Sequence, residues 1–241
     1  MEEVSHYFNN ADSKTLALFD VDLVLVQPSD PAFQMPNIKR FDAIYKRVMK
    51  RVPIDKKLLF FSLMTLSSDP ILIDSRTPQV LQQLTQRGVS MMALTASLTG
   101  SFGKISNMEQ WRVDSLRQLG IDFSKTSPCS IPLLFDEFIP YRNYYPNYLH
   151  GILFVNGIVP KGDGFLSFLK KINWLPNKII FIDDHEYNLK SLENAIQKLN
   201  SNIEYQGLHF IGAKSFSSEL ISEDEFEFRW ERLATEVQYL D

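Results

Sequence analysis

The chain has little cysteine, no long apolar run and no surplus of positive charge, and each absence narrows what the protein can be. Its single cysteine, Cys129, cannot form an internal disulfide, so the fold does not depend on an oxidising compartment. No apolar stretch approaches the roughly 18 residues of a membrane-spanning helix, and residues 1–4 lack the basic and apolar regions of a secretory signal. We therefore expect a soluble protein, cytoplasmic by default, with export left open for a chain whose leader was removed.

Charge and composition limit the partners. The net charge of −4 and the isoelectric point near 5.6 argue against a broad surface for nucleic acid or for a membrane, so we expect neither as a partner. The basic residues of segment 39–51 alternate with an apolar stripe, which favours the solvated face of a helix over a basic rim that steers an anionic substrate. The 241 residues, 44% of them apolar, suffice for one α/β domain with insertions. The oligomeric state stays open.

Two carboxylates stand at the end of the apolar stretch 16–19. In a strand with a period of two, residues i and i+2 point the same way, so Asp20 and Asp22 are expected to share one crevice. Two acids this close repel each other, and the arrangement is typical of a site where a cation lies between them or one acid stays protonated. The alternative is a strand that ends in a solvated turn.

Two later residues add groups of the kind that phosphoryl transfer requires. Thr95 ends the strand that we predict for residues 89–95, which places its hydroxyl at a carboxyl end. Lys161 stands immediately before the apolar-periodic segment 165–169 and is expected at the entrance of a helix. Taken alone, each has an ordinary explanation, because threonine ends many strands and lysine flanks many helices.

A second pair of acids closes another apolar run. Residues 178–182 are typical of a strand buried on both faces of a parallel sheet, and Asp183 with Asp184 follows directly. In an open α/β sheet, the loops at the carboxyl ends of the strands converge on one crevice. The residues expected to meet there are Asp20, Asp22, Thr95, Lys161, Asp183 and Asp184.

This order of residues resembles the four motifs of the haloacid dehalogenase superfamily, whose phosphatases carry Asp-x-Asp-x-(Thr/Val), then Ser or Thr, then Lys, then one or two acids. The resemblance covers about residues 14–212, and further similarity in the run 148–154 suggests an uncharacterised bacterial branch. Leu23 stands where many members have Gly, and residues 96–97 follow the hydroxyl where others have a basic residue. The matching residues are Asp20, Asp22 and Val24 for the first motif, then Thr95, then Lys161, then Asp183 with Asp184.

The resemblance implies a fold and a reaction. The fold is α/β, with a Rossmann-like parallel sheet, helices on both faces and a mainly helical cap. The reaction is Mg²⁺-dependent hydrolysis of a small phosphomonoester through an aspartyl-phosphate. Asp20 would be the nucleophile, and Asp22 would serve as general acid and then general base. Thr95 and Lys161 would hold phosphoryl oxygens, and Lys161 would also hold Asp20.

The same resemblance implies the residues around the metal. A Mg²⁺ ion prefers oxygen ligands, and the Asp20 carboxylate, the Asp22 backbone carbonyl and Asp183 would supply three of them. Asp184 would lie outside these ligands, where it orients Lys161 or a metal-bound water, unless it merely caps the following helix. Asn188 would also belong to this outer layer, unless it is only a polar residue in the first turns of the helix.

Spacing suggests how the chain is divided. More residues separate the motifs than one crossover helix needs, so we expect two insertions, the second with a hairpin whose turn is formed by residues 156–157. Apolar residues at spacings of four and three predict a carboxyl-terminal helix. The expected division is a catalytic core at 14–26 and 76–212, a helical cap at 27–75, a second insertion at 96–160, and a helix at 223–240 packed on the core.

Two other functions remain open from the sequence. A phosphotransferase would pass the phosphoryl group from Asp20 to a second alcohol instead of water. A non-catalytic interaction protein could use the same scaffold, because fold does not decide function. The usual sign of the latter is loss of the nucleophile or the lysine, and the chain keeps both Asp20 and Lys161.

Overall fold

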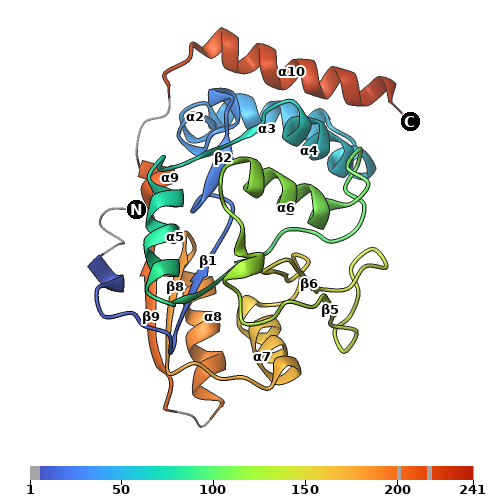
Figure 1. Ribbon diagram of the computed structural model, residues 1–241. Coiled ribbons are helices and arrows are strands. Elements are labelled where there is room, and N and C mark those ends of the chain that lie inside the picture. Colours follow the sequence, from blue (N-terminus) through green and yellow to red (C-terminus); the bar gives the residue numbers. More distant parts are fainter. Residues whose placement is uncertain (1–5, 200–201, 216–218, 241) are drawn as a thin grey trace.

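The computed structural model describes residues 6–199, 202–215 and 219–240, and its centre is a seven-stranded, mostly parallel sheet (Figure 1). The strand order is β5-β6-β7-β4-β1-β8-β9. Each strand pairs in parallel with its neighbour in the series β7-β4-β1-β8-β9. Strands β6 and β5 extend the sheet at the β7 edge with antiparallel pairing. The prediction of an α/β chain is confirmed at this level. The strands are β1 Thr15–Phe19, β4 Ser90–Thr95, β5 Leu133–Leu134, β6 Asn147–Leu149, β7 Ile152–Phe154, β8 Lys178–Asp183 and β9 Glu204–His209.

Alternate residues of the central strands face two opposite layers of helices. In β1, Ala17 and Phe19 join one apolar cluster, whereas Leu16 and Leu18 join the other. All four are buried, which explains why this stretch is apolar throughout instead of alternating. Full burial of a large apolar side chain contributes about 1.5–3 kcal/mol. Helices α5 (Thr77–Gln86) and α6 (Met108–Gln118) complete the first cluster, and α7 (Lys161–Ile172) and α8 (Glu186–Gln197) complete the second.

The order of the strands changes direction between β1 and β8. From β1 the chain continues to β4 and then β7 on one side, whereas β8 and β9 lie on the other side. The strand order therefore reverses between β1 and β8, and open α/β sheets bind ligands at the carboxyl ends of strands at such a point. Asp20 directly follows β1, Asp183 ends β8, and the backbone N–H of Asp20 donates to the Ile182 carbonyl at 2.9 Å.

Segment 27–75 forms a mainly helical layer above the carboxyl ends of the strands (Figure 1). Its stem is a two-stranded antiparallel sheet of β2 (Val26–Pro28) and β3 (Pro70–Leu72). We call this layer the cap. Between the two strands of the stem lie η2 Pro31–Phe33, α2 Met35–Arg40, α3 Asp42–Arg51, η3 Ile54–Lys56 and α4 Lys57–Leu66.

The carboxyl-terminal helix α10 (Glu223–Tyr239) packs on the cap, so the prediction that it packs on the catalytic core is wrong. Its apolar face is present as predicted. Trp230 stacks on Phe60 of α4 and meets Phe33 and Tyr45 edge to face. The physical reason is that the apolar stripe of the cap also needs cover, and α10 supplies it across the top of the molecule (Figure 1).

The predicted hairpin lies one turn earlier than expected. Residues 156–157 do form a turn with positive φ at both positions, but no strand follows, because the chain leads into α7. The buried Asn156 side chain instead joins neighbouring loops, accepting from Thr99 N at 2.9 Å and donating to Tyr144 O at 2.7 Å. The hairpin that forms joins β6 to β7 through His150 and Gly151, whose φ values of 48° and 84° suit a two-residue turn.

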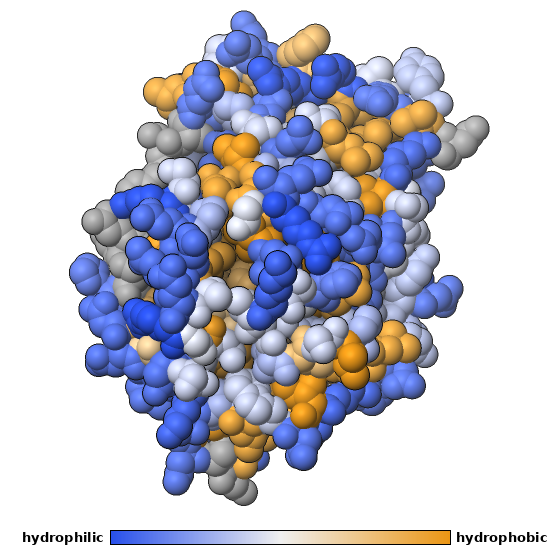
Figure 2. Space-filling view, viewed as in Figure 1, coloured by the Kyte–Doolittle hydropathy of each residue, from blue (hydrophilic) through white to orange (hydrophobic). Residues whose placement is uncertain are grey.

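Short elements complete the described chain: η1 His6–Phe8, η4 Phe123–Lys125 and α9 Gly212–Ser215. Within the described ranges, no helix combines the length and the apolar character that crossing a membrane requires. On the face shown in Figure 2, hydrophilic side chains predominate, with smaller apolar areas between them. Cys129 is a free, half-buried thiol.

Candidate functional site

A buried lysine bridges two carboxylates at the ends of β1 and β8. Lys161 Nζ lies 2.8 Å from Asp20 Oδ1 and 2.6 Å from Asp183 Oδ2. All three residues are buried, with 2% of the Lys161 surface exposed. The structure thus brings together three residues that lie far apart in the sequence, as their positions on strand ends and at a helix entrance predicted. A charge buried this deeply requires partners of opposite charge, and the two aspartates supply them.

Two glycines allow Lys161 to enter so deeply. Lys161 is the first residue of α7, directly after Pro160. A Cβ atom on Gly162 would lie 2.2 Å from the Ser191 carbonyl oxygen of α8, and one on Gly164 would lie 2.6 Å from a Val155 methyl group. The start of α7 can therefore approach both α8 and the end of β7 only because these positions lack side chains.

Burial and charge shift the protonation of this cluster. Burial raises the pKa of the Asp20 carboxyl to about 7, because the Lys161 charge offsets only part of that effect and the charges of Asp183 and Asp22 add to it. Burial alone would lower the pKa of Lys161, but the charges and hydrogen bonds of Asp20 and Asp183 outweigh it and raise that pKa. The cluster therefore holds its lysine charged and still carries an excess of acid.

The two oxygens of Asp20 differ in their surroundings. Oδ1 accepts a hydrogen bond from the backbone N–H of Val21 at 2.8 Å and contacts Lys161. Among the described residues, Oδ2 has no hydrogen-bond or ion-pair partner. One oxygen thus anchors the side chain and the other is available to a cation or a reacting atom.

The two acids at the end of β8, Asp183 and Asp184, contact different groups. Asp183 Oδ1 accepts from the backbone N–H of His185 at 2.8 Å and from Asn188 Nδ2 at 2.9 Å. Asn188 thus contacts a candidate ligand, and its place in the outer layer of a metal site stays a prediction. Lys214 Nζ of α9 lies 2.6 Å from Asp184 Oδ2. Lys214 Nζ also donates to the backbone carbonyl of Asp184, so this buried carboxylate is ion-paired.

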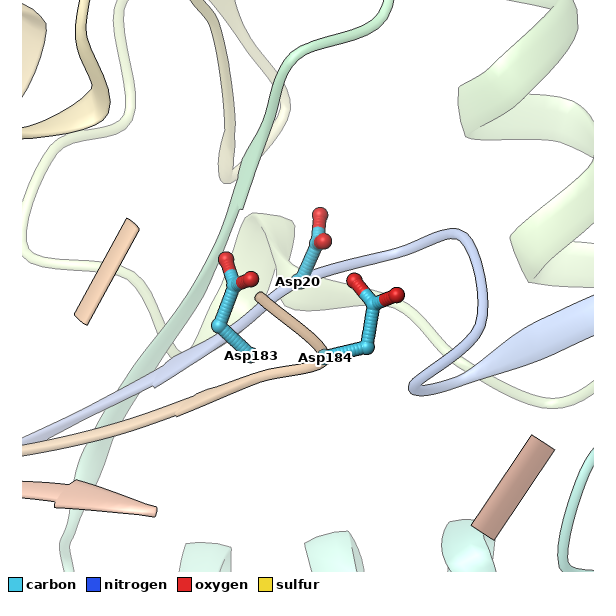
Figure 3. A group of neighbouring side chains, drawn as sticks. All are labelled: Asp20, Asp183 and Asp184. Atoms are coloured by element: carbon cyan, nitrogen blue, oxygen red, sulfur yellow. The ribbon is translucent and has the colours of Figure 1, made fainter. Parts of the chain in front are cut away.

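The residues fit a divalent cation. Carboxylate oxygens of Asp20, Asp183 and Asp184 lie within 4.8 Å of one another, and Figure 3 shows the three side chains projecting to the same side of the strand ends. An all-oxygen set suits a hard cation such as Mg²⁺. Asp184, expected outside the direct ligands, thus joins the carboxylates that could bind the ion. The Asp22 carbonyl stays a predicted ligand.

Asp22 does not share a strand face with Asp20, which corrects the expected geometry. Strand β1 ends at Phe19, and the backbone then turns, with Leu23 in the left-handed region at a φ of 63°. The Asp22 side chain is 54% exposed and lies 2.8 Å from Arg112 Nη2 of α6. Asp20 therefore faces Lys161, while Asp22 reaches toward α6, although its charge still acts on Asp20. The cause is a strand that stops at Phe19, three residues short of Asp22, so the period-2 argument does not apply.

Thr95 ends β4 as predicted and is buried. Its Oγ1 donates to Ser97 Oγ at 3.0 Å and accepts from the Ser97 N–H at 3.1 Å. Ser97 Oγ in turn donates to Asp22 Oδ2 at 3.3 Å. The structure thus connects Thr95 to Asp22 through Ser97, and its predicted contact with a phosphoryl oxygen stays a prediction.

Arg112 is the residue that reasoning from the sequence missed. It lies on the buried face of α6, where Met108 and Leu116 stand four residues before and after it. A charged residue in the middle of such an apolar row is a signal that could have found it, because buried arginines are paired. Its guanidinium group is nevertheless aimed at Asp22 by tertiary packing alone.

Fold and site define an α/β protein with a buried acid and lysine cluster at the reversal of strand order. The chain belongs to the family described as protein of unknown function (DUF2608), whose model matches residues 1–239. An uncharacterized protein of Rickettsia felis is 27% identical over 167 residues, covering 68% of this chain and 56% of that protein. The uncharacterized protein RP295 of Rickettsia prowazekii is 31% identical over 138 residues, covering 57% of this chain and 46% of its own length.

A longer match is to an uncharacterized protein of Rickettsia bellii, 23% identical over 212 residues and covering 86% of this chain and 72% of the relative. The chain spans about half the length of the first two relatives. No solved structure matches it.

Proposed function

We propose that this protein is a Mg²⁺-dependent phosphomonoester hydrolase with a haloacid dehalogenase-like core, acting through an aspartyl-phosphate. The observation that carries the proposal is the bridge from Lys161 to Asp20 and Asp183 at the strand reversal, with Asp184 beside it. Catalytic groups commonly have perturbed pKa values in such positions, and the raised pKa of Asp20 agrees with this.

Asp20 is the proposed nucleophile. Its Oδ1 is anchored by Val21 N–H and Lys161, so Oδ2 can form the bond to phosphorus while the bond to the leaving oxygen breaks. Lys161 would offset the charge that gathers on the attacking carboxylate and on a phosphoryl oxygen. Asp20, Asp183 and Asp184 would hold the Mg²⁺ ion, whose positive charge allows an anionic ester to approach an anionic nucleophile.

Asp22 is the proposed proton donor and acceptor. Its half-exposed carboxyl can give a proton to the leaving oxygen in the first step. In the second step, Asp22 takes a proton from a water molecule whose oxygen bonds to phosphorus, and the bond from phosphorus to Asp20 breaks. Inorganic phosphate leaves and Asp20 is regenerated. Thr95 is proposed to donate a hydrogen bond to a phosphoryl oxygen.

Hydrolysis is favoured over the two alternative functions. A phosphotransferase would use the same nucleophile, but it would have to exclude water from Asp22, and that side chain is 54% exposed. A non-catalytic scaffold has no need to hold a lysine between two buried carboxylates, an arrangement that costs desolvation energy. The proposed substrate class is a small phosphomonoester.

The test is hydrolysis of p-nitrophenyl phosphate, and of a panel of small phosphomonoesters, with and without Mg²⁺. We expect Asp20→Asn to lower kcat by about 10³-fold or more, because no covalent intermediate can form. Asp163→Asn is the matched control, since Asp163 is an exposed aspartate near the start of α7 and should keep wild-type activity. Equal, metal-independent turnover by wild type and Asp20→Asn would end the proposal.

A further inference from the structure

Arg112 places a nearly buried positive charge against the proposed proton donor. It is 6% exposed, and its Nη2 lies 2.8 Å from Asp22 Oδ1 and 3.0 Å from Asp22 Oδ2. The arginine comes from α6, a helix that supplies no other residue of the proposed site. The contact therefore links the helix after β4 to the turn after β1.

Arg112 depends on the ion pair for its burial, whereas Asp22 does not. Burying a guanidinium group is costly unless it is paired, and Asp22 is the partner that Arg112 has among the described residues, with the Trp111 ring 5.2 Å away. Arg112 Nε is buried and has no hydrogen-bond partner. Asp22 is half exposed, so water alone could solvate it in several side-chain orientations. Asp22 therefore does not need Arg112 for its solvation. It does need Arg112 if its carboxyl group is to keep one orientation.

A second contact restricts the same carboxylate. Ser97 Oγ donates to Asp22 Oδ2 at 3.3 Å, and Thr95 Oγ1 donates to Ser97 Oγ. The carboxylate is thus held from α6 on one side and from the end of β4 on the other. Two fixed donors from different elements define one orientation of a short side chain, which general acid and base catalysis requires.

We propose that Arg112 is a positioning residue that acts through Asp22 and keeps its carboxyl aligned for both proton transfers. This proposal rests on the proposed hydrolase function. Without Arg112, the Asp22 side chain would keep only the contact with Ser97 and would adopt other orientations, while Asp20, Lys161 and Asp183 would keep their geometry. The loss should therefore be largest for a substrate whose leaving group needs a proton.

The experiment compares kcat/KM for phenyl phosphate, whose leaving oxygen needs protonation, with that for p-nitrophenyl phosphate, whose leaving oxygen does not. The variants are Arg112→Gln, Arg112→Lys, Asp22→Asn and the double variant Asp22→Asn with Arg112→Gln. Arg117→Gln is the matched control, because Arg117 lies on the same helix, is 36% exposed and pairs weakly with Asp122 at 3.6 Å. Thermal unfolding of each variant checks that it is folded.

We expect Arg112→Gln to lower kcat/KM about 30-fold for phenyl phosphate and less than about fivefold for p-nitrophenyl phosphate, with Arg112→Lys between it and wild type. Added to Asp22→Asn, the Arg112→Gln change should cost less than about twofold more, because a residue that acts through Asp22 has nothing left to position. Arg117→Gln should match wild type.

Three results would overturn the role of Arg112: equal losses on both esters, multiplicative losses in the double variant, or a rise in KM with kcat unchanged. Each of these would leave the hydrolase proposal standing. Failure of the hydrolase proposal shows elsewhere, as equal turnover by wild type and Asp20→Asn, and that result would overturn both proposals.

Discussion

Two sets of ion pairs in this molecule have similar distances but differ in how far they are buried. Lys161 contacts Asp20 and Asp183 at 2.8 and 2.6 Å with 1% of its side chain exposed. On the cap, Arg47 and Arg51 of α3 contact Glu227 and Glu231 of α10 at 2.5 and 2.7 Å, with 52% and 53% of the arginine side chains exposed.

Burial, and not distance, decides what such a pair does. Exposed pairs are screened by water and contribute about 0–1 kcal/mol, so the attachment of α10 to the cap depends mainly on the apolar contacts of Trp230. A buried pair is costly to form and very costly to break, which makes it a poor device for stability and a good one for holding charged groups ready for chemistry. Four predictions test this contrast, beginning with the largest effect.

Lys161→Met should have the largest effect. It leaves Asp20 and Asp183 buried without their cation, so we expect a loss of about 3–5 kcal/mol in unfolding free energy without metal and at least about 10³-fold in kcat. Thermal unfolding and phosphomonoester hydrolysis measure the two losses. Lys170→Met, an exposed change on the same helix, is the control. A Lys161→Met protein as stable and active as this control would refute the contrast.

Trp230→Ala should destabilise the cap by about 3–5 kcal/mol, because it empties the space between α10, Phe33 and Phe60 and removes the hydrogen bond from Trp230 Nε1 to Ala32 O. The expected fall in melting temperature is about 10 °C. Phe228→Ala removes an exposed aromatic from the same helix and should change little. Similar melting temperatures for both variants would show that α10 is not held by its apolar face.

Asp184→Asn should weaken Mg²⁺ binding about 10- to 100-fold, since it removes one negative charge from the three carboxylates that face each other. The Mg²⁺ dependence of activity and calorimetric titration with Mg²⁺ measure this directly. Asp163→Asn serves again as the control. Unchanged Mg²⁺ affinity would exclude Asp184 from the metal site while leaving Asp20 and Asp183 as candidates.

Arg47→Gln together with Arg51→Gln should have the smallest effect, about 1 kcal/mol or less in total, or roughly 2 °C in melting temperature. The reason is solvent screening of both pairs. Lys46→Gln, which breaks the exposed pair with Asp42 on the same helix, gives the baseline. A loss as large as that of Trp230→Ala would mean that these pairs, and not the apolar face, attach α10.

These surface pairs also answer part of the question raised by the basic segment 39–51. Arg47 and Arg51 face α10, and Lys46 pairs with Asp42 within α3. The apolar stripe of the segment is buried beneath them. Residues 42–51 therefore form an amphipathic helix, α3, rather than a basic rim open to substrate, and residues 39–40 end the preceding helix α2.

Part of the site could be predicted because it depends on local order. Asp20, Thr95 and Asp183 each follow an apolar run, and Lys161 precedes a periodic one, so each position follows from where a strand ends or a helix begins. Parallel strands bring such ends to one edge of the sheet. The proximity of Asp20, Lys161 and Asp183 follows from these two facts.

The remaining contacts depend on distances that no local pattern contains. The turn after Phe19 sends Asp22 toward Arg112, and whether the strand would continue for three more residues could not be read from its composition. The partner of α10 could not be predicted either. An apolar stripe shows that one face of a helix is buried, but it does not show which element covers that face.

By itself, the sequence determined the central strands β1, β4 and β8, the helices α7 and α10, and the positions of Asp20, Thr95, Lys161 and Asp183 at their ends, because helix and strand periodicity act over a few residues. Only the tertiary structure decided that Lys161 lies between Asp20 and Asp183, that Arg112 forms an ion pair with Asp22, and that α10 covers the cap. These contacts join segments far apart in the chain, and they form where packing brings complementary charge or apolar surface together.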